Sequence, residues 1–99
     1  MAKYKVGDYV LADIPYYPSN IKNVICIIKR FTQTGNDFFA LVIFVPKQYD
    51  QNCFLHNTYK FSFRNIKMPI INKIFFFCGG LFVIDGDECF ELDTLCHIL

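Results

Sequence analysis

The feature that most constrains this sequence is a strict alternation of aromatic and polar side chains over residues 59–64, YKFSFR. Neighbouring side chains of a β-strand point to opposite faces, whereas the apolar stripe of a helix repeats every three to four residues. The period of two therefore predicts a strand with one apolar face and one face in water. The residues of the apolar face are Tyr59, Phe61 and Phe63.

Three further strands are predicted in the first half of the chain. Residues 24–32 and 38–45 are rich in β-branched and aromatic side chains and flank the turn signal TGND, which predicts a hairpin. Pro46 ends its second arm, because proline cannot donate to a β-ladder. Residues 6–14 alternate as a strand that precedes the hairpin. The residues expected on its core face are Val10, Ala12 and Ile14.

The last third of the chain contains the longest apolar run, residues 74–84 (IFFFCGGLFVI). Its 11 residues are far fewer than the roughly 20 that a membrane-spanning helix needs. The Gly79-Gly80 pair suits two strands meeting at a bend, or one strand with a bulge. We expect a break at Met68-Pro69, a strand over residues 70–77, a turn at 85–87 and a short strand over 89–92.

The remaining segments complete the predicted architecture. Residues 15–23 and 47–57 have the composition of loops, and Asp93 is suited to capping a short helix over residues 94–99. Five to seven short strands with tight turns indicate an all-β fold, a small SH3-like barrel with a short C-terminal helical turn. A chain of 99 residues has room for one core, so we expect a single domain over residues 1–99.

The composition indicates a partner surface. Hydrophobic residues make up 54% of the chain, more than one small barrel should need inside. Three consecutive phenylalanines of one strand cannot all point inward, so at least one faces out. We expect a protein partner or a homodimer held by an interface of Phe75, Phe76, Phe77 and Phe82. The alternative is that the C-terminal turn covers this patch with Leu95, Ile98 and Leu99.

The charge pattern gives little support for nucleic-acid binding. The formal net charge is only +1, although every Lys and Arg lies at or before Lys73 and the residues after it carry only acidic charge. Lys60 and Arg64 fall on the face opposite the aromatic residues of their strand, whereas a stacking surface needs both kinds together. We expect at most weak, salt-dependent binding of nucleic acid, and no membrane association.

The five cysteines and two histidines do not form a strong metal or catalytic pattern. The number of cysteines is odd and the N-terminus has no signal-peptide core, which indicates a reducing, nuclear or cytoplasmic location. Cys26 and Cys78 are predicted in the core. The ligand types needed for zinc occur at Cys53, His56, Cys89, Cys96 and His97, but without two paired clusters. We expect no metal, no cofactor and no catalytic residues.

Aromatic residues next to carboxylates suggest one ligand pocket. Tyr16 and Tyr17 follow the first strand, and Phe38 and Phe39 open the third. If these strand ends converge, the rings together with Asp13 or Asp37 could enclose a methylated ammonium group through cation–π contacts. The alternative is that these rings simply pack in the core.

Two short segments carry a family resemblance. Residues 4–11 (YKVGDYVL) resemble the start of bromo-adjacent homology (BAH) domains and are similar to the first strand of Tudor-type barrels. Residues 42–46 (VIFVP) resemble the BAH strand that ends in an aromatic residue and a proline. The resemblance covers the first half of the chain. It implies an SH3-like barrel that acts as a noncatalytic, chromatin-associated binding module for a histone or other protein tail. The alternatives are an assembly subunit or homodimer, and a single-stranded nucleic-acid binder.

Overall fold

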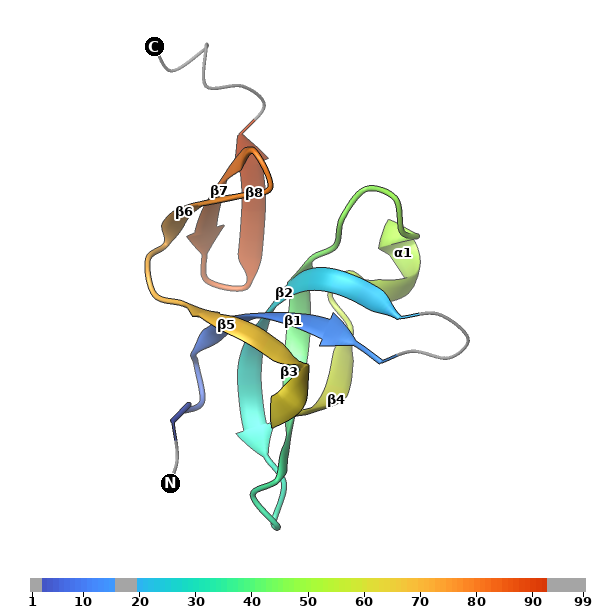
Figure 1. Ribbon diagram of the computed structural model, residues 1–99, viewed down its shortest axis with the longest axis vertical. Helices are drawn as coiled ribbons and strands as arrows, with labels where there is room; N and C mark the ends of the chain where they lie inside the picture. Colours follow the sequence, from blue (N-terminus) through green and yellow to red (C-terminus); the bar gives the residue numbers. More distant parts are fainter. Residues whose placement is uncertain (1–2, 16–19, 93–99) are drawn as a thin grey trace.

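The computed structural model describes residues 3–15 and 20–92, and these form an all-β protein with two antiparallel sheets (Figure 1). The larger sheet has the strand order β4-β3-β2-β1-β5, and the smaller has the order β6-β7-β8. The predicted fold class is confirmed, with eight strands in the described ranges where five to seven were expected. The elements are β1 (Tyr9–Ile14), β2 (Ile21–Phe31), β3 (Asp37–Phe44), α1 (Gln51–Phe54), β4 (Thr58–Ser62), the 3-10 turn η1 (Phe63–Asn65), β5 (Ile66–Ile70), β6 (Ile74–Phe77), β7 (Gly80–Asp85) and β8 (Glu88–Leu92).

The five-stranded sheet combines a meander with one long return connection. β1 to β4 follow one another as a meander, and after η1 the chain returns so that β5 pairs with β1. Register shifts interrupt the ladders of β1 with both neighbours and of β2 with β3, and such irregularities increase the bend of a sheet. No ladder joins β4 to β5 within the described part of the chain, so the barrel is not closed.

The predicted hairpin is confirmed as β2 and β3, which pair from Phe31 and Phe38 near the turn to Ile25 and Phe44 at the far end. The first strand begins later than predicted. Gly7 has a φ of +96° inside a turn, a conformation that an extended strand does not contain, so β1 starts at Tyr9.

One face of the large sheet covers the first core. Phe38 and Phe61 are fully buried there and stack with ring centroids 5.4 Å apart. The alternation is confirmed within β4, with Phe61 inside and Lys60 exposed. The strand predicted over residues 59–64 ends at Ser62, however, because Phe63 and Arg64 belong to the 3-10 turn η1. The predicted core face of β1 is also confirmed: Val10, Ala12 and Ile14 all belong to this cluster.

The loop predicted over residues 47–57 contains one unexpected element. Residues 51–54 form a single helical turn, which begins where the Asp50 side chain accepts the backbone N–H of Asn52 at 3.1 Å. This turn places Phe54 in the first core.

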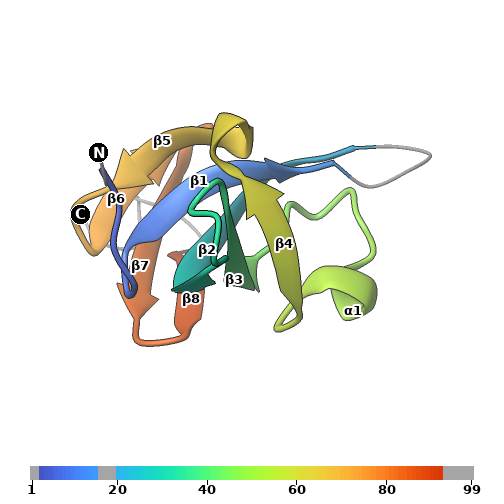
Figure 2. The same cartoon turned by 90° about the horizontal axis from the view of Figure 1, so that it is seen from below.

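The opposite face of the same strands covers a second core, which lies against the small sheet. Leu11 and Ile25 pack there with Phe82 and Ile84 of β7. Figure 2 shows β7 and β8 on one side of β1 and β2. Polar contacts add to this packing, because the Tyr9 hydroxyl donates to the Gly86 carbonyl at 2.9 Å. The central strands are thus buried on both faces, which a simple alternating pattern does not indicate.

Three predictions for the last third of the chain need correction. Pro69 does not separate two strands but lies within β5, where an edge position tolerates proline because its missing N–H would have pointed away from the sheet. The break comes instead at residues 71–73. Cys78 is exposed rather than in the core, since it forms with Gly79 the tight turn between β6 and β7. Their φ values are +51° and +78°, as a type I′ hairpin requires.

The long apolar run therefore forms two strands, β6 and β7. No helix within residues 3–15 and 20–92 has the length and apolar character needed to cross a membrane. The predicted helical turn over 94–99 lies outside the described residues.

Candidate functional site

The residues of the predicted aromatic pocket do not come together in the described structure. Tyr16 and Tyr17 lie outside the described residues. Phe38 is fully buried in the first core, where its ring presents no face to a ligand. Phe39 points to the other side of β3, and the guanidinium carbon of Arg30 lies 3.9 Å from its ring centroid. The face of the Phe39 ring is therefore already occupied by the side chain of Arg30.

The two candidate carboxylates are also separated. Asp13 accepts the backbone N–H of Asn23 at 3.0 Å and lies 3.7 Å from the Lys67 ammonium. Asp37 lines a shallow hollow together with Lys60 and Arg64. Two neighbouring cations raise the local potential, so this hollow repels a second ammonium group rather than attracting it.

Three of the cysteines have raised pKa values, which favours the neutral thiol. Burial raises the pKa of Cys26 to about 12, and burial followed by the charge of Glu91 raises the pKa of Cys89 to about 11. The pKa of exposed Cys53 is raised first by the hydrogen bond from its thiol to Asp50, with a sulfur–oxygen distance of 3.1 Å. A cysteine nucleophile or metal ligand needs the opposite shift, toward thiolate.

The candidate zinc ligands are not clustered in the part of the chain that the structure describes. No group of three Cys, His, Asp or Glu side chains there is arranged to hold a metal ion. His56 lies 3.4 Å from Glu88, in an exposed contact between the loop after α1 and β8. Cys96 and His97 lie outside the described residues.

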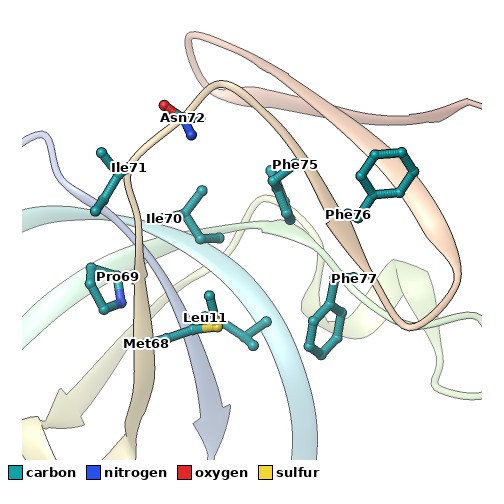
Figure 3. Close-up of a pocket in the computed structure, with 9 residues that line it drawn as sticks. All are labelled: Leu11, Met68, Pro69, Ile70, Ile71, Asn72, Phe75, Phe76 and Phe77. Atoms are coloured by element: carbon teal, nitrogen blue, oxygen red, sulfur yellow. The ribbon is translucent and has the colours of Figure 1, made fainter.

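An apolar groove between β5 and β6 is the candidate site (Figure 3). Its volume is about 220 Å³, below the range of roughly 300–1,000 Å³ typical of small-molecule pockets, so it suits one or two bulky side chains better than a drug-sized ligand. In Figure 3, Phe75 and Phe77 lie on the side of β6 that faces β5. The groove is lined by Leu11, Met68, Pro69, Ile70, Ile71, Asn72, Phe75, Phe76 and Phe77.

The β6 strand borders this groove with an unpaired backbone edge. Lys73 accepts a hydrogen bond from the backbone N–H of Ile84, which sets the alternation of the ladder between β6 and β7. In an antiparallel pair every second residue directs its N–H and C=O away from the partner strand, and in β6 these residues are Ile74 and Phe76. Because β6 is the edge of its sheet in the described part of the chain, these groups have no strand partner there and can pair with another strand.

The β5 edge across the groove is protected, whereas the β6 edge is not. Pro69 removes the one N–H that β5 would offer beside Val10, its partner in β1. Edge strands are commonly blunted by proline or by charge, and β6 (IFFF) carries neither. Lys73 lies at the start of β6, exposed and without an ion pair among the described residues.

The predicted interface residues divide between the inside and the outside of the small sheet. Phe82 is 3% exposed and stacks on half-buried Phe75 at 5.4 Å, so both serve the second core. Phe77 is half-buried at the groove, and Phe76 is 66% exposed. The prediction that at least one of the three consecutive phenylalanines faces out is confirmed. The sequence did not reveal the groove, because it is formed by two strand edges whose neighbours only the tertiary structure decides.

Comparison of the chain with protein-family models, with curated protein sequences and with solved structures finds no match.

Proposed function

We propose that this protein is a noncatalytic binding module that takes up an extended segment of another polypeptide by strand addition to β6. The observation that carries the proposal is the open backbone edge at Ile74 and Phe76, directly beside an apolar groove. An added strand gains main-chain hydrogen bonds from such an edge and specificity from pockets for alternate side chains. The predicted role as a binder of a protein tail is kept, at a different site from the one expected.

The groove defines the chemistry of the segment. None of its lining side chains is charged, and Asn72 is the one polar residue among them. Side chains of an added strand alternate between its two faces, so every second residue would enter the groove beside Leu11 and Phe77. Bulky apolar residues at alternate positions suit this environment, because burying an unpaired charge there is costly.

The charge at the rim favours an acidic partner. Lys73 stands at the start of β6, and a carboxylate beyond the apolar part of the segment would meet it. A strongly basic tail of the histone kind would instead meet this cation. We therefore propose a neutral or acidic apolar segment, and no described contact favours recognition of a methylated ammonium group.

The proposal that the protein is not an enzyme is supported by the three raised thiol pKa values and by the lack of a polar constellation in the groove. Exposed free thiols at Cys53 and Cys78 support a reducing, intracellular compartment.

The backbone contribution is tested by two substitutions at one position. Phe76→Pro and Phe76→Ala both remove the ring, but only proline removes the edge N–H. That N–H makes no bond to β7, so the fold should tolerate either change. Binding of a fluorescent eight-residue peptide with alternating valine and threonine and a glutamate at one end is measured by anisotropy. We expect Phe76→Pro to weaken binding at least about tenfold more than Phe76→Ala. The reason is that proline cannot donate the hydrogen bond to the added strand, whose carbonyl is then left without a partner.

Two controls distinguish strand addition from nonspecific hydrophobic association. A peptide of the same composition with lysine in place of glutamate should bind more weakly to the wild type, and Lys73→Glu should reverse that preference. Circular dichroism checks that each variant is folded. Equal affinities of Phe76→Pro and Phe76→Ala for the peptide would overturn the proposal. So would a wild type that binds neither peptide at about 1 mM, since a dissociation constant of that size corresponds to a binding free energy of only about −4 kcal/mol.

A further inference from the structure

The small sheet is apolar on both faces, although only one of them covers the second core. Residues at directly paired positions of an antiparallel sheet share a face, so β6, β7 and β8 contribute two rows of three residues to the side that points away from the large sheet. We call this side the outer face. Its rows are Ile74, Val83 and Phe90, and Phe76, Leu81 and Leu92.

Four of these six side chains are strongly exposed. Ile74, Phe76, Phe90 and Leu92 are between 38% and 66% exposed, and Leu81 and Val83 between them are partly buried. With about 200 Å² for a fully exposed large side chain, the four exposed fractions correspond to roughly 400 Å² of contiguous apolar surface. Apolar patches of this size are often functional, so the outer face is a candidate interaction site.

One end of the outer face is acidic. The next paired positions along the strands are Asp85 and Glu88, which lie on the same side as the two apolar rows. The opposite end is the uncharged turn of Cys78 and Gly79. The outer face therefore has a direction along its strands, with negative charge at one end only.

We propose that the outer face is the contact surface of a homodimer, in which two small sheets pack face to face. Two copies would bury roughly 800 Å² of apolar side chain, and about 1,000 Å² once Leu81, Val83 and the surrounding backbone are included, which reaches the lower limit of specific interfaces. A dimer of this size should be weak, with a dissociation constant on the order of 10 μM. The inference does not depend on peptide binding, because only Phe76 belongs to both the outer face and the groove.

The acidic end selects one arrangement of the two copies. If the two-fold axis ran along the strands, Asp85 and Glu88 of both copies would lie opposite each other and repel. If the axis runs across the strands, each Ile74 row packs on the Phe76 row of the other copy, and the acidic ends lie at opposite sides of the dimer. We assign the second arrangement, in which the sheets lie about 10 Å apart as in other sheet-on-sheet contacts.

The test is the oligomeric state of the full chain by analytical ultracentrifugation, from about 1 μM to about 1 mM, a range that spans the expected dissociation constant. Phe90→Asp changes the outer face on β8, a strand that contributes no residue to the groove lining. It should weaken the dimer at least about fiftyfold by placing a charge in an apolar contact. Ile71→Asp is the matched control, because Ile71 is 86% exposed, more than any other large apolar residue in the described ranges, and lies outside the small sheet.

The outcomes separate the second copy from other occupants. A wild type that stays monomeric throughout this range overturns the proposal, as does an equal loss of dimer in Ile71→Asp and Phe90→Asp. A monomeric wild type whose melting temperature falls by several degrees in Phe90→Asp would show that residues 93–99 of the same chain cover the outer face, and would also overturn it. Peptide binding that persists in Phe90→Asp would show that the groove acts independently.

Discussion

Replacing Phe82 by alanine tests whether the second core attaches the small sheet to the large one. Phe82 is the most central aromatic residue of that core, with its ring 4.8 Å from Phe44 of β3 in an edge-on contact and 5.4 Å from Phe75 of β6 in a stacked contact. It thus joins both sheets through a single side chain. Removing it leaves a cavity bordered by both Phe44 and Phe75.

The expected cost follows from burial and from the two ring contacts. Deleting a buried phenylalanine side chain destabilises a protein by about 3–5 kcal/mol, and each aromatic pair contributes about 0.5–1.5 kcal/mol of the stabilisation. We expect Phe82→Ala to lower the free energy that holds the small sheet on the large one by about 4 kcal/mol. Since a domain of this length has a total stability of roughly 5–15 kcal/mol, the small sheet should then open without unfolding of the large one.

Hydrogen exchange resolved by residue measures this directly. Phe82→Ala should remove most of the protection of β7 amides while those of β2 and β3, which also border the first core, keep theirs. Ile71→Ala is the control, because Ile71 is 86% exposed, lies outside the small sheet and should contribute less than about 0.5 kcal/mol to the unfolding free energy. The argument that the small sheet opens independently of the large one would be refuted by either of two results. One is a decrease in unfolding free energy below about 1 kcal/mol for Phe82→Ala, and the other is an equal loss of exchange protection in both sheets.

Two further predictions concern the tight turn and the thiols. Gly79→Ala places a side chain at a φ of +78° and should lower the unfolding free energy by about 1 kcal/mol, whereas Cys78→Asn, at a φ of +51°, should raise it slightly; urea denaturation measures both. Above the ordinary thiol pKa of 9.0, Cys26 and Cys89 ionise first in the unfolded chain, so stability should fall from pH 9 to about 11 through Cys89 and to about 12 through Cys26. The slope should reach about 1.4 kcal/mol per pH unit for each thiol and be smaller in Cys26→Ala, and an identical slope in that variant would contradict the reasoning.

The local features of the fold could be predicted because they depend on residues close together in the chain. The β2–β3 hairpin follows from two apolar runs around a turn signal, and the solvent-exposed and buried faces of β4 follow from its alternation. The turn at Gly86 was predicted from the Asp-Gly pair, and Gly86 has a positive φ there.

The features that depend on tertiary neighbours could not be predicted. Pro69 resembles a strand break until β5 is known to be an edge. Cys78 lies within an apolar run, yet the turn geometry exposes it. Phe38 and Phe39 were expected to share a pocket, but adjacent residues of a strand face opposite sides, and only the structure shows that the side of Phe38 is the first core. The groove depends on which strands remain unpaired, and local sequence does not carry that information.

The pairing of β1 with β5 also has a consequence for the order of folding. Every other ladder in the described part of the chain joins strands that are consecutive in sequence, whereas this one brings Tyr9 beside Ile70. Closing so long a loop costs entropy before any contact compensates for it, so the return of β5 should be the slow step that limits the folding rate. During synthesis on the ribosome, the β6–β8 meander emerges only after that step has become available. Once β5 has returned, the inner phenylalanines of β6 and β7 have a completed surface to pack against, so the rate of that step sets how long the most apolar part of the chain spends in water.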